Sequence, residues 1–313
     1  MPTLGVDIGG TKVLGVALDE DGTVVAEHRV PTPRGSEALV DDVLEVVAVL
    51  RDACDGASAV GVGLPGLVDR SGVLRFAPNL PGVVELPVGR LVADAIGLPV
   101  IVDNDATCAT WAEHRVGAAR GAADVILVTL GTGIGGGIVL DGRLMRGAHG
   151  FAGEIGHMVV DADGIACVCG RRGCWERYAS GSGLGRIARE AAEAGLGRRL
   201  VALAGGDPDL VRGEHVTAAA LEGDAEALAV LDRFAGWFAV GLANLVHILD
   251  VGTCVVGGGL VEAGDVVLGP IRRAFVDRVV APDHRPPVPI VPAELGERAG
   301  AIGAALLAGG FSG

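Results

Sequence analysis

The sequence predicts a mixed α/β protein built from two similar halves. Short apolar runs that suit strands alternate with stretches whose apolar residues recur at helical spacing. The pattern VDIGGTKVLGVALDEDG near the start returns as VTLGTGIGGGIVLDG at residues 128–142. Two copies are too few for a solenoid, so we expect a fold with two related halves.

Strands flanking a glycine turn open the first half. Leu4–Ile8 and Val13–Leu18 are apolar runs, and Asp21-Gly22 predicts a hairpin into a third strand at Thr23–Val30. Apolar positions at helical spacing predict a helix over residues 36–54. The elements expected next are a strand at Val60–Leu64, a helix at Val88–Ile96, a strand at Val100–Val102 and a helix at Thr107–Val116.

The second half repeats the opening and then becomes helical. Asp124–Leu130 and Ile138–Leu140 read as strands around the glycine turn GTGIGGG. The elements expected after them are a long helical stretch over about 216–249, a strand at Thr253–Val256, an edge strand in the loop PDHRPPVPIVP and a final helix over about 298–308. The apolar segment FAGWFAVGLANLVHIL fits the core better than a subunit interface.

Composition and charge exclude several classes of protein. The 313 residues carry a formal net charge of −14 and no cluster of five basic residues, so nucleic acid is not an expected partner. Gly, Asp or Arg interrupts the apolar runs before 18 residues, which predicts no membrane span. The start MPTLGVDIGG lacks a signal-peptide pattern, so a cytoplasmic location with reduced or metal-bound thiols is expected.

Three glycine-rich turns follow apolar runs. Gly131-Thr-Gly-Ile-Gly-Gly-Gly137 contains a GxGxxG match, but it leads into another strand rather than a helix, which argues against a dinucleotide fold. In DIGGTK no glycine directly precedes Lys12, the only lysine of the chain, so it is not a Walker loop. The third turn is the GGG at 257–259. Each of these turns alone could be a simple tight turn, but together they suit phosphate binding through backbone N–H groups.

The three turns suggest a nucleotide site in which each turn has its own role. Asp7 could hold a hydrated Mg²⁺, while Thr11 and Lys12 contact phosphate oxygens. The turn at 131–133 would face the first across a cleft, and the GGG at 257–259 would allow a close approach of a nucleoside.

An acidic tetrapeptide, Asp103-Asn104-Asp105-Ala106, follows the predicted strand at Val100–Val102. Asp103 or Asp105 could simply be the N-cap of the next helix. The alternative is a general base, since phosphoryl transfer needs a carboxylate that takes the proton of the attacking hydroxyl. Asn104 offers a donor and an acceptor, which suits a sugar hydroxyl.

Taken together, these motifs make the chain resemble the sugar kinases of the ROK (repressor, ORF, kinase) family. DIGGTK, GLPG, NDA, GTGIGGGIVLDG, AGEIGH, CxCGxxGCxE and VVGGGL occur in the family's order and span almost the whole chain. The resemblance implies an actin-like ATPase (ribonuclease H-like) fold with two similar lobes that close over a cleft. The expected lobes are residues 1–117 with the C-terminal helix 298–313, and residues 118–297 with a zinc-binding loop.

The resemblance also implies roles for individual residues. Asp105 matches the catalytic base that acts on the sugar's primary hydroxyl. The positions that match sugar-binding residues are Gly66, Asn79, Asn104, Glu154, His157 and Glu176. The positions that match ATP and phosphate contacts are Asp7, Gly10, Thr11, Lys12, Gly131, Thr132, Gly133, Gly257, Gly258 and Gly259. One departure is Asp103, where the family commonly has Glu in ENDAN.

Three cysteines within eight residues form a candidate metal site. Cys167, Cys169 and Cys174 with His157 make a Cys₃His set, which suits a closed tetrahedral zinc site. A disulfide would leave one thiol over and is disfavoured in a reducing compartment. The resemblance supports the zinc interpretation. It also implies that the zinc orients the sugar-binding residues, because one nitrogen of His157 could bind zinc while the other faces the sugar. Cys54, Cys108 and Cys254 are expected to be small buried apolar residues.

The resemblance implies transfer of the γ-phosphoryl group of Mg-ATP to a hexose, and GHM and CWERYASG point to the bacterial glucokinase branch. The expected reaction is phosphorylation of glucose at its 6-hydroxyl. The alternatives are a kinase for an N-acetylated hexosamine or fructose, and a non-enzymatic sugar sensor or repressor. A repressor would place a DNA-binding segment before residue 7, for which we expect no room. A homodimer or homotetramer is expected from the family.

Overall fold

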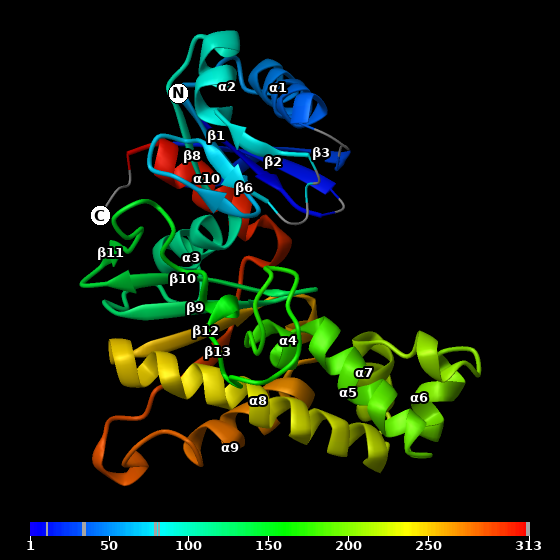
Figure 1. The fold of residues 1–313 in the computed structure, drawn as a ribbon. Coiled ribbons are helices and arrows are strands. Elements are labelled where there is room, and N and C mark those ends of the chain that lie inside the picture. The colour runs from blue at the N-terminus through cyan, green and yellow to red at the C-terminus, as the bar shows by residue number, and fades with distance from the viewer. Residues whose placement is uncertain (11, 33–35, 78–79, 81, 311–313) are drawn as a thin grey trace. The chain divides into compact units, whose positions relative to one another are not determined.

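The computed structural model describes residues 1–10, 12–32, 36–77, 80 and 82–310. They form a mixed α/β fold, as predicted, and the chain divides into two compact units (Figure 1). Unit 1 comprises Met1–Leu127, Gly136–Gly153 and Ala293–Gly313, and unit 2 comprises Val128–Gly135 and Glu154–Pro292. The lobe boundaries and the cleft expected from the sequence stay predictions.

A five-stranded sheet forms the centre of unit 1. Its strands, in the order β3-β2-β1-β4-β8, are β1 (Thr3–Ile8), β2 (Lys12–Leu18), β3 (Val24–Pro31), β4 (Ala59–Leu64) and β8 (Val100–Asn104). The first three strands are antiparallel neighbours, and β1, β4 and β8 run parallel. Because parallel strands end at the same sheet edge, Asp7 and Asn104 come to that edge together.

Helices cover both faces of this sheet. Helices α1 (Ser36–Ala53) and α2 (Val88–Ile96) pack on one face, and α3 (Asp105–Val116) and α10 (Ala299–Ala308) on the other (Figure 1). The apolar spacing predicted for the first helix is confirmed, since Leu39, Val43 and Val46 are fully buried in the core. A small sheet flanks the unit, with strands β5 (Leu67–Val68), β6 (Leu74–Phe76) and β7 (Val84–Leu86).

The second sheet has the same strand order as the first. Its strands, in the order β11-β10-β9-β12-β13, are β9 (Val125–Leu130), β10 (Ile134–Leu140), β11 (Arg143–Leu144), β12 (Thr253–Gly257) and β13 (Ile290–Pro292). The sequence repeat therefore corresponds to a repeated topology. Strand β10 begins four residues before the expected Ile138, because Gly135–Gly137 continue the strand instead of forming a turn. The predicted edge strand in the proline-rich loop is β13.

Unit 2 is mostly helical beyond the sheet. Its helices are α4 (Glu176–Ala179), α5 (Gly181–Glu193), α6 (Arg198–Leu203), α7 (Gly213–Leu221), α8 (Ala225–Leu249) and α9 (Asp265–Val276), and its short 3₁₀ turns are at Ile155–His157, Pro208–Leu210, Gly259–Ala263 and Pro282–His284. A further 3₁₀ turn, η5 (Gly296–Arg298), precedes α10 in unit 1. The helical stretch expected over about 216–249 is confirmed, and it is divided between α7 and α8. Gly223 takes a φ of 83° and Asp224 caps a new helix by accepting from Ala227 N at 2.8 Å.

Helix α8 is the core helix of unit 2. Phe234, Phe238 and Leu242 are buried, which confirms a core role for the apolar segment. By length and composition α8 could cross a membrane, a possibility that counting uninterrupted apolar runs did not detect. Of its apolar stretch of 18 residues, 61% is buried inside the protein, and the helix packs against α9, α5, α7 and α4, as a core helix does.

A glycine in α8 makes room for a buried tryptophan. Trp175 is fully buried, lies tilted against Phe238 at 5.3 Å between ring centroids and donates its indole N–H to Trp237 O at 2.9 Å. A Cβ at Gly241 would lie 2.1 Å from Cε2 of this ring. Since Trp175 directly follows Cys174, this contact ties the cysteine loop to the core of unit 2.

Replacing Gly241 with Ala should therefore lower the free energy of unfolding by about 1–3 kcal/mol, because the methyl group overpacks the core. Gly236→Ala is the matched control, since a Cβ there meets only the end of Arg278 at 3.3 Å. The control should be neutral or gain up to about 1 kcal/mol of helix propensity. Urea unfolding curves measure both. If Gly241→Ala and Gly236→Ala raised the free energy of unfolding equally, the tight contact between a Cβ at Gly241 and the Trp175 ring would be contradicted.

Candidate functional site

Asp7 and Asp105 form an acidic pair at the carboxyl edge of the first sheet. Asp7 lies near the end of β1, and Asp105 is the first residue of α3, directly after β8. Although Asp7 as a residue is partly exposed, its Oδ1 atom is buried and has no hydrogen-bond partner among the described residues. An orphaned buried carboxylate oxygen is a feature that a cation with its waters would satisfy.

The surroundings of Asp7 disfavour its charged form. Burial, and second the nearby charge of Asp105, raise the pKa of Asp7 to about 8, against the opposing effect of Lys12. The first turn of α10 packs closely on this carboxylate, where a Cβ at Gly300 would lie 2.5 Å from Asp7 Cγ. The protein therefore holds two carboxyl groups close together in a poorly solvated place, which is costly without a bound cation.

Asn104 connects the acidic pair to a neighbouring loop. Its Oδ1 accepts from Thr107 N at 3.0 Å, so Asn104 is the N-cap of α3. The alternative that Asp103 or Asp105 caps this helix is wrong, because the helix begins at Asp105 and the preceding residue has the extended backbone of a cap. The Asn104 Nδ2 donates to Gly66 O at 3.2 Å, and this amide keeps a second N–H and a second lone pair for a ligand.

Lys12 begins strand β2 and forms an ion pair with Glu297, which also pairs with Arg29. No local sequence pattern indicated Glu297, which lies 285 residues away from Lys12. Gly10 at the same turn is exposed, and no atom within 4 Å would contact a Cβ there. Thr11 and Asn79, which the family resemblance singles out, lie outside the described residues.

The other two glycine turns lie in unit 2. Gly131 N donates to Gly133 O at 3.1 Å, and Gly131 O accepts from Gly181 N at 2.9 Å, so the turn is fixed while Gly131 and Thr132 stay exposed. Gly258 has a φ of 92°, and a Cβ there would lie 2.3 Å from Leu130 O. The backbone of Gly258 therefore packs closely against the end of β9, which only glycine allows, while the nucleoside contact expected of the GGG triplet stays a prediction.

Three predicted sugar-binding residues gather in unit 2. His157 Nε2 lies 3.9 Å from Glu154 Oε2, and His157 Nδ1 lies 3.8 Å from Glu176 Oε1. His157 belongs to a short 3₁₀ turn and Glu176 begins α4. The imidazole thus has one nitrogen on the side of each carboxylate. Gly66, Asn104 and Asp105 belong to unit 1.

The cysteine loop brings the four predicted metal ligands together. The ligand atoms of His157, Cys167, Cys169 and Cys174 all lie within 4.8 Å of one another. Cys169 Sγ is 3.6 Å from Cys174 Sγ, and Cys167 Sγ is 3.8 Å from His157 Nδ1. Bonds to one tetrahedral zinc ion would place two thiolates about 3.8 Å apart and a thiolate and an imidazole nitrogen about 3.6 Å apart. The geometry therefore fits zinc.

The remaining cysteines are separate from this cluster. Cys108 and Cys254 are fully buried, as predicted, whereas Cys54 is only half-buried.

Burial raises the pKa of the Cys167 and Cys174 thiols, so a metal must displace protons when it binds them. Tyr178, the only tyrosine, supports the loop by accepting from Ile165 N and donating to Asp161 Oδ2, both at 2.9 Å.

Replacing Asp7 with Asn should stabilise the metal-free protein above pH 5. The raised pKa means that the folded state holds this proton more tightly, so wild-type stability falls as pH rises from about 4 to about 8. The Asn side chain cannot ionise, so its advantage should grow by up to about 1.4 kcal/mol per pH unit in this window. Asp94→Asn, at an exposed carboxylate, is the control. Unfolding curves that stay parallel from pH 5 to 8 would refute the shift.

Comparisons with known proteins agree with this arrangement. The chain is 43% identical over 309 residues to a glucokinase of Streptomyces coelicolor, covering 98% of this chain and 97% of the relative. It is 33% identical over 314 residues to an N-acetylmannosamine kinase of Citrobacter koseri, covering 99% of both chains.

A solved structure supports the same assignment. The ROK glucokinase of Streptomyces griseus in complex with glucose and AMPPNP superposes with a TM-score of 0.88 at 41% identity, covering 99% of this chain and 100% of that one. The actin-like ATPase fold expected from the sequence is confirmed by this likeness. The family model of the ROK family matches residues 3–310, and the chain therefore belongs to the ROK family.

Proposed function

We propose that the chain is an ATP-dependent glucokinase that phosphorylates glucose at its 6-hydroxyl. The observation that carries the proposal is the acidic pair Asp7 and Asp105 at one sheet edge, in a chain 41% identical to a kinase solved with glucose and AMPPNP. The relative named a glucokinase matches over nearly the whole chain, which adds support.

In this proposal Asp105 is the general base. Its position at the first turn of α3 is fixed by the cap at Asn104, and its Oδ1 accepts from its neighbour Ala106 N at 2.8 Å. The carboxylate would take the proton of the 6-hydroxyl as that oxygen attacks the γ-phosphorus. Such a base contributes about 10²–10⁴-fold to the rate. The amide of Asn104 would hold a sugar hydroxyl beside it.

The phosphates of ATP are assigned to the glycine turns and Lys12. The turns at Asp7–Lys12 and Gly131–Gly133 offer backbone N–H groups, and Lys12 would exchange Glu297 for a phosphate oxygen. The GGG at 257–259 would accept the nucleoside. Asp7, with its unpartnered buried oxygen, would hold hydrated Mg²⁺, which neutralises charge on the phosphoryl oxygens when bound.

The sugar would be held by Glu154, His157 and Glu176, with Gly66 and Asn79 in adjoining loops. Zinc on Cys167, Cys169, Cys174 and His157 Nδ1 would leave no open coordination position, so its contribution is structural. The four ligands would fix the imidazole with Nε2 turned to the side of Glu154, where a sugar hydroxyl can bind. We further propose a cytoplasmic homodimer or homotetramer, by analogy with the family.

The proposed reaction predicts turnover with glucose that depends on Asp105. Purified protein with Mg-ATP should release ADP fastest with glucose among glucose, mannose, fructose, N-acetylglucosamine and N-acetylmannosamine. Asp105→Asn should lower kcat by about 10²–10⁴-fold, because the attacking hydroxyl loses its base. A coupled assay for ADP measures both.

The same assay separates the competing functions. Preference for an acetylated sugar would keep the mechanism and replace the substrate, in line with the N-acetylmannosamine kinase relative. Binding of sugar without ADP release by the folded, zinc-loaded protein would favour a sensor. Asp94→Asn, at an exposed helix position, should keep wild-type kcat and serves as the control.

The zinc assignment predicts the loss of one metal ion in Cys169→Ser. Zinc content measured by mass spectrometry should fall from one ion per chain to less than about 0.1. The KM for glucose should rise about 10-fold or more, because His157 is proposed to bind both the zinc ion and the sugar. Cys54→Ser should keep both values, since Cys54 lies outside the cluster. A zinc-free Cys169→Ser protein with unchanged KM and unchanged stability would disprove the positional role.

A further inference from the structure

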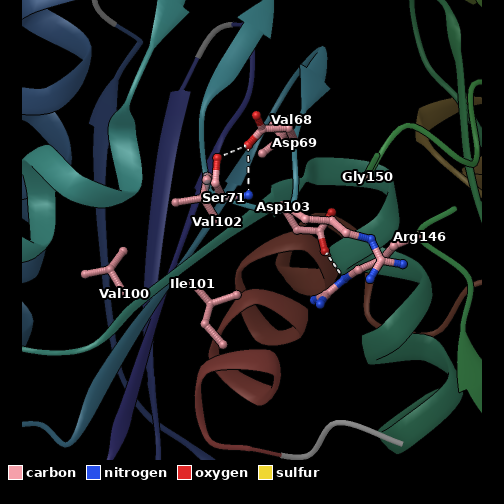
Figure 2. Close-up of a pocket in the computed structure, with 11 residues that line it drawn as sticks. Val68, Asp69, Ser71, Val100, Ile101, Val102, Asp103, Arg146 and Gly150 are labelled. Carbon is pink, nitrogen blue, oxygen red and sulfur yellow. Dashed lines mark hydrogen bonds and ion pairs between the residues drawn. The ribbon is translucent and has the colours of Figure 1, made fainter. Parts of the chain in front are cut away.

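An ion pair between a buried carboxylate and a partly exposed arginine lies directly before the proposed base. Asp103 is only 5% exposed, and its Oδ2 lies 2.6 Å from Arg146 Nε (Figure 2). Both residues belong to unit 1, and both line a pocket of about 200 Å³. We propose that Asp103 and Arg146 are a positioning pair for phosphoryl transfer, which sets the orientation of the chain segment that carries Asp105. This inference rests on the proposed function.

The two oxygens of Asp103 have different tasks. Oδ2 faces Arg146, while Oδ1 accepts from the backbone N–H of Asn104 at 2.9 Å. The carboxylate therefore links the guanidinium to the peptide unit that precedes the helix. Burial raises the pKa of Asp103, and the charge of Arg146 opposes this shift. Without the guanidinium, the charge of Asp103 would be left buried and uncompensated.

The link continues into the site through Asn104. The peptide held by Asp103 belongs to the residue that caps α3 through Thr107 N and donates to Gly66 O. Asp105 is the next residue, so a rotation of the Asn104 peptide changes the direction of its carboxylate. A displacement of about 1 Å in a reacting group can cost on the order of 10²-fold in rate.

Arg146 is itself held by a second element. It follows β11 in a loop that is fixed to the turn between β5 and β6, where Arg70 Nε donates to Gly147 O at 2.9 Å and Arg70 N donates to His149 O at 3.2 Å. The guanidinium is thus presented from a loop with its own anchors. This gives the pair a fixed geometry, which an exposed arginine lacks.

The pair also compensates for a shorter side chain. The resemblance to the ROK family places Glu where this chain has Asp103. Here the short carboxylate reaches its own following peptide and leaves its second oxygen to a loop arginine. The pair joins β8 to the loop after β11, so the start of α3 is braced by two elements distant in sequence.

The pocket provides a direct test by chemical rescue. Arg146→Ala should lower kcat for glucose about 10–100-fold with the KM for ATP changed less than about 2-fold, because the base is misplaced while the nucleotide contacts persist. Guanidinium at millimolar concentration can enter the enlarged pocket and should restore kcat at least 5-fold. Arg143→Ala, on the exposed edge of the same hairpin, should show neither loss nor rescue.

Asp103→Asn and the double variant complete the test. Each single variant should lose kcat to a similar extent, and the double variant should be no worse than either, since both changes break one interaction. Unchanged kcat in Arg146→Ala would overturn the proposal. So would a loss that guanidinium does not restore, or a loss that matches the unfolded fraction measured by circular dichroism.

A readout without activity keeps the proposal separate from the proposed function. Hydrogen exchange of the backbone amides of residues 104–107 should be about 10-fold faster in Arg146→Ala, while those in α1 keep wild-type rates. If wild-type protein phosphorylates no sugar, the proposed function fails, and this measurement still decides whether the pair orders the start of α3. Unchanged exchange at 104–107 would refute the pair's positioning role.

Discussion

Two carboxyl groups held in a poorly hydrated place are the constraint on which unit 1 depends. Asp7 lies on β1 and Asp105 directly follows β8, and because β1 and β8 run parallel on either side of β4, the sheet brings both residues to one edge. Burial and the nearby charge of Asp105 act against the charge of Asp7 and raise its pKa, and the first turn of α10 packs closely on the Asp7 carboxylate. Such an arrangement is costly in folding and useful when a cation and a polyphosphate bind beside it.

The rest of unit 1 can be understood as support for this edge. Helix α10 packs against β1 and β4 and also against α3, so the segments that carry the two acids share one neighbour. Glu113 adds a further brace. It is fully buried and accepts from the backbone N–H groups of Ala118, Glu294 and Leu295, which fixes the chain just before α10. These buried polar contacts are satisfied by backbone donors and therefore tolerate burial.

In unit 2 the main constraint is different, because a loop of small and polar residues must be held in an ordered conformation. The cysteine loop, residues 161–174, is anchored at its end by the following Trp175 in the helical core and near its start by Tyr178, which hydrogen-bonds Asp161 and Ile165. Close thiols gain little from one another, and the proposed zinc ion would add strong bonds between the clustered thiols and His157. A single ion would thus order the loop and orient His157 at once.

The sequence by itself determined the order of the elements and the chemistry of the motifs. Local signals were sufficient for this: the repeat around DIGGTK and GTGIGGG, the helical spacing of residues 36–54 and the cysteine spacing all depend on neighbouring residues. The break between α7 and α8 was missed, because Gly223 and Asp224 are weak signals inside a long apolar pattern.

Only the tertiary structure decided which distant residues meet. The pairs Lys12 with Glu297, Asp103 with Arg146, and Glu113 with Leu295 join segments with no local pattern in common. The N-cap of α3 is Asn104 rather than Asp103 or Asp105, the two residues that the sequence offered as alternatives, for a related reason. Three neighbouring polar residues can each cap a helix, and only the backbone conformation at Asn104 selects one of them. Long-range pairing and backbone angles depend on the packed sheet, and so they cannot be read from the order of residues.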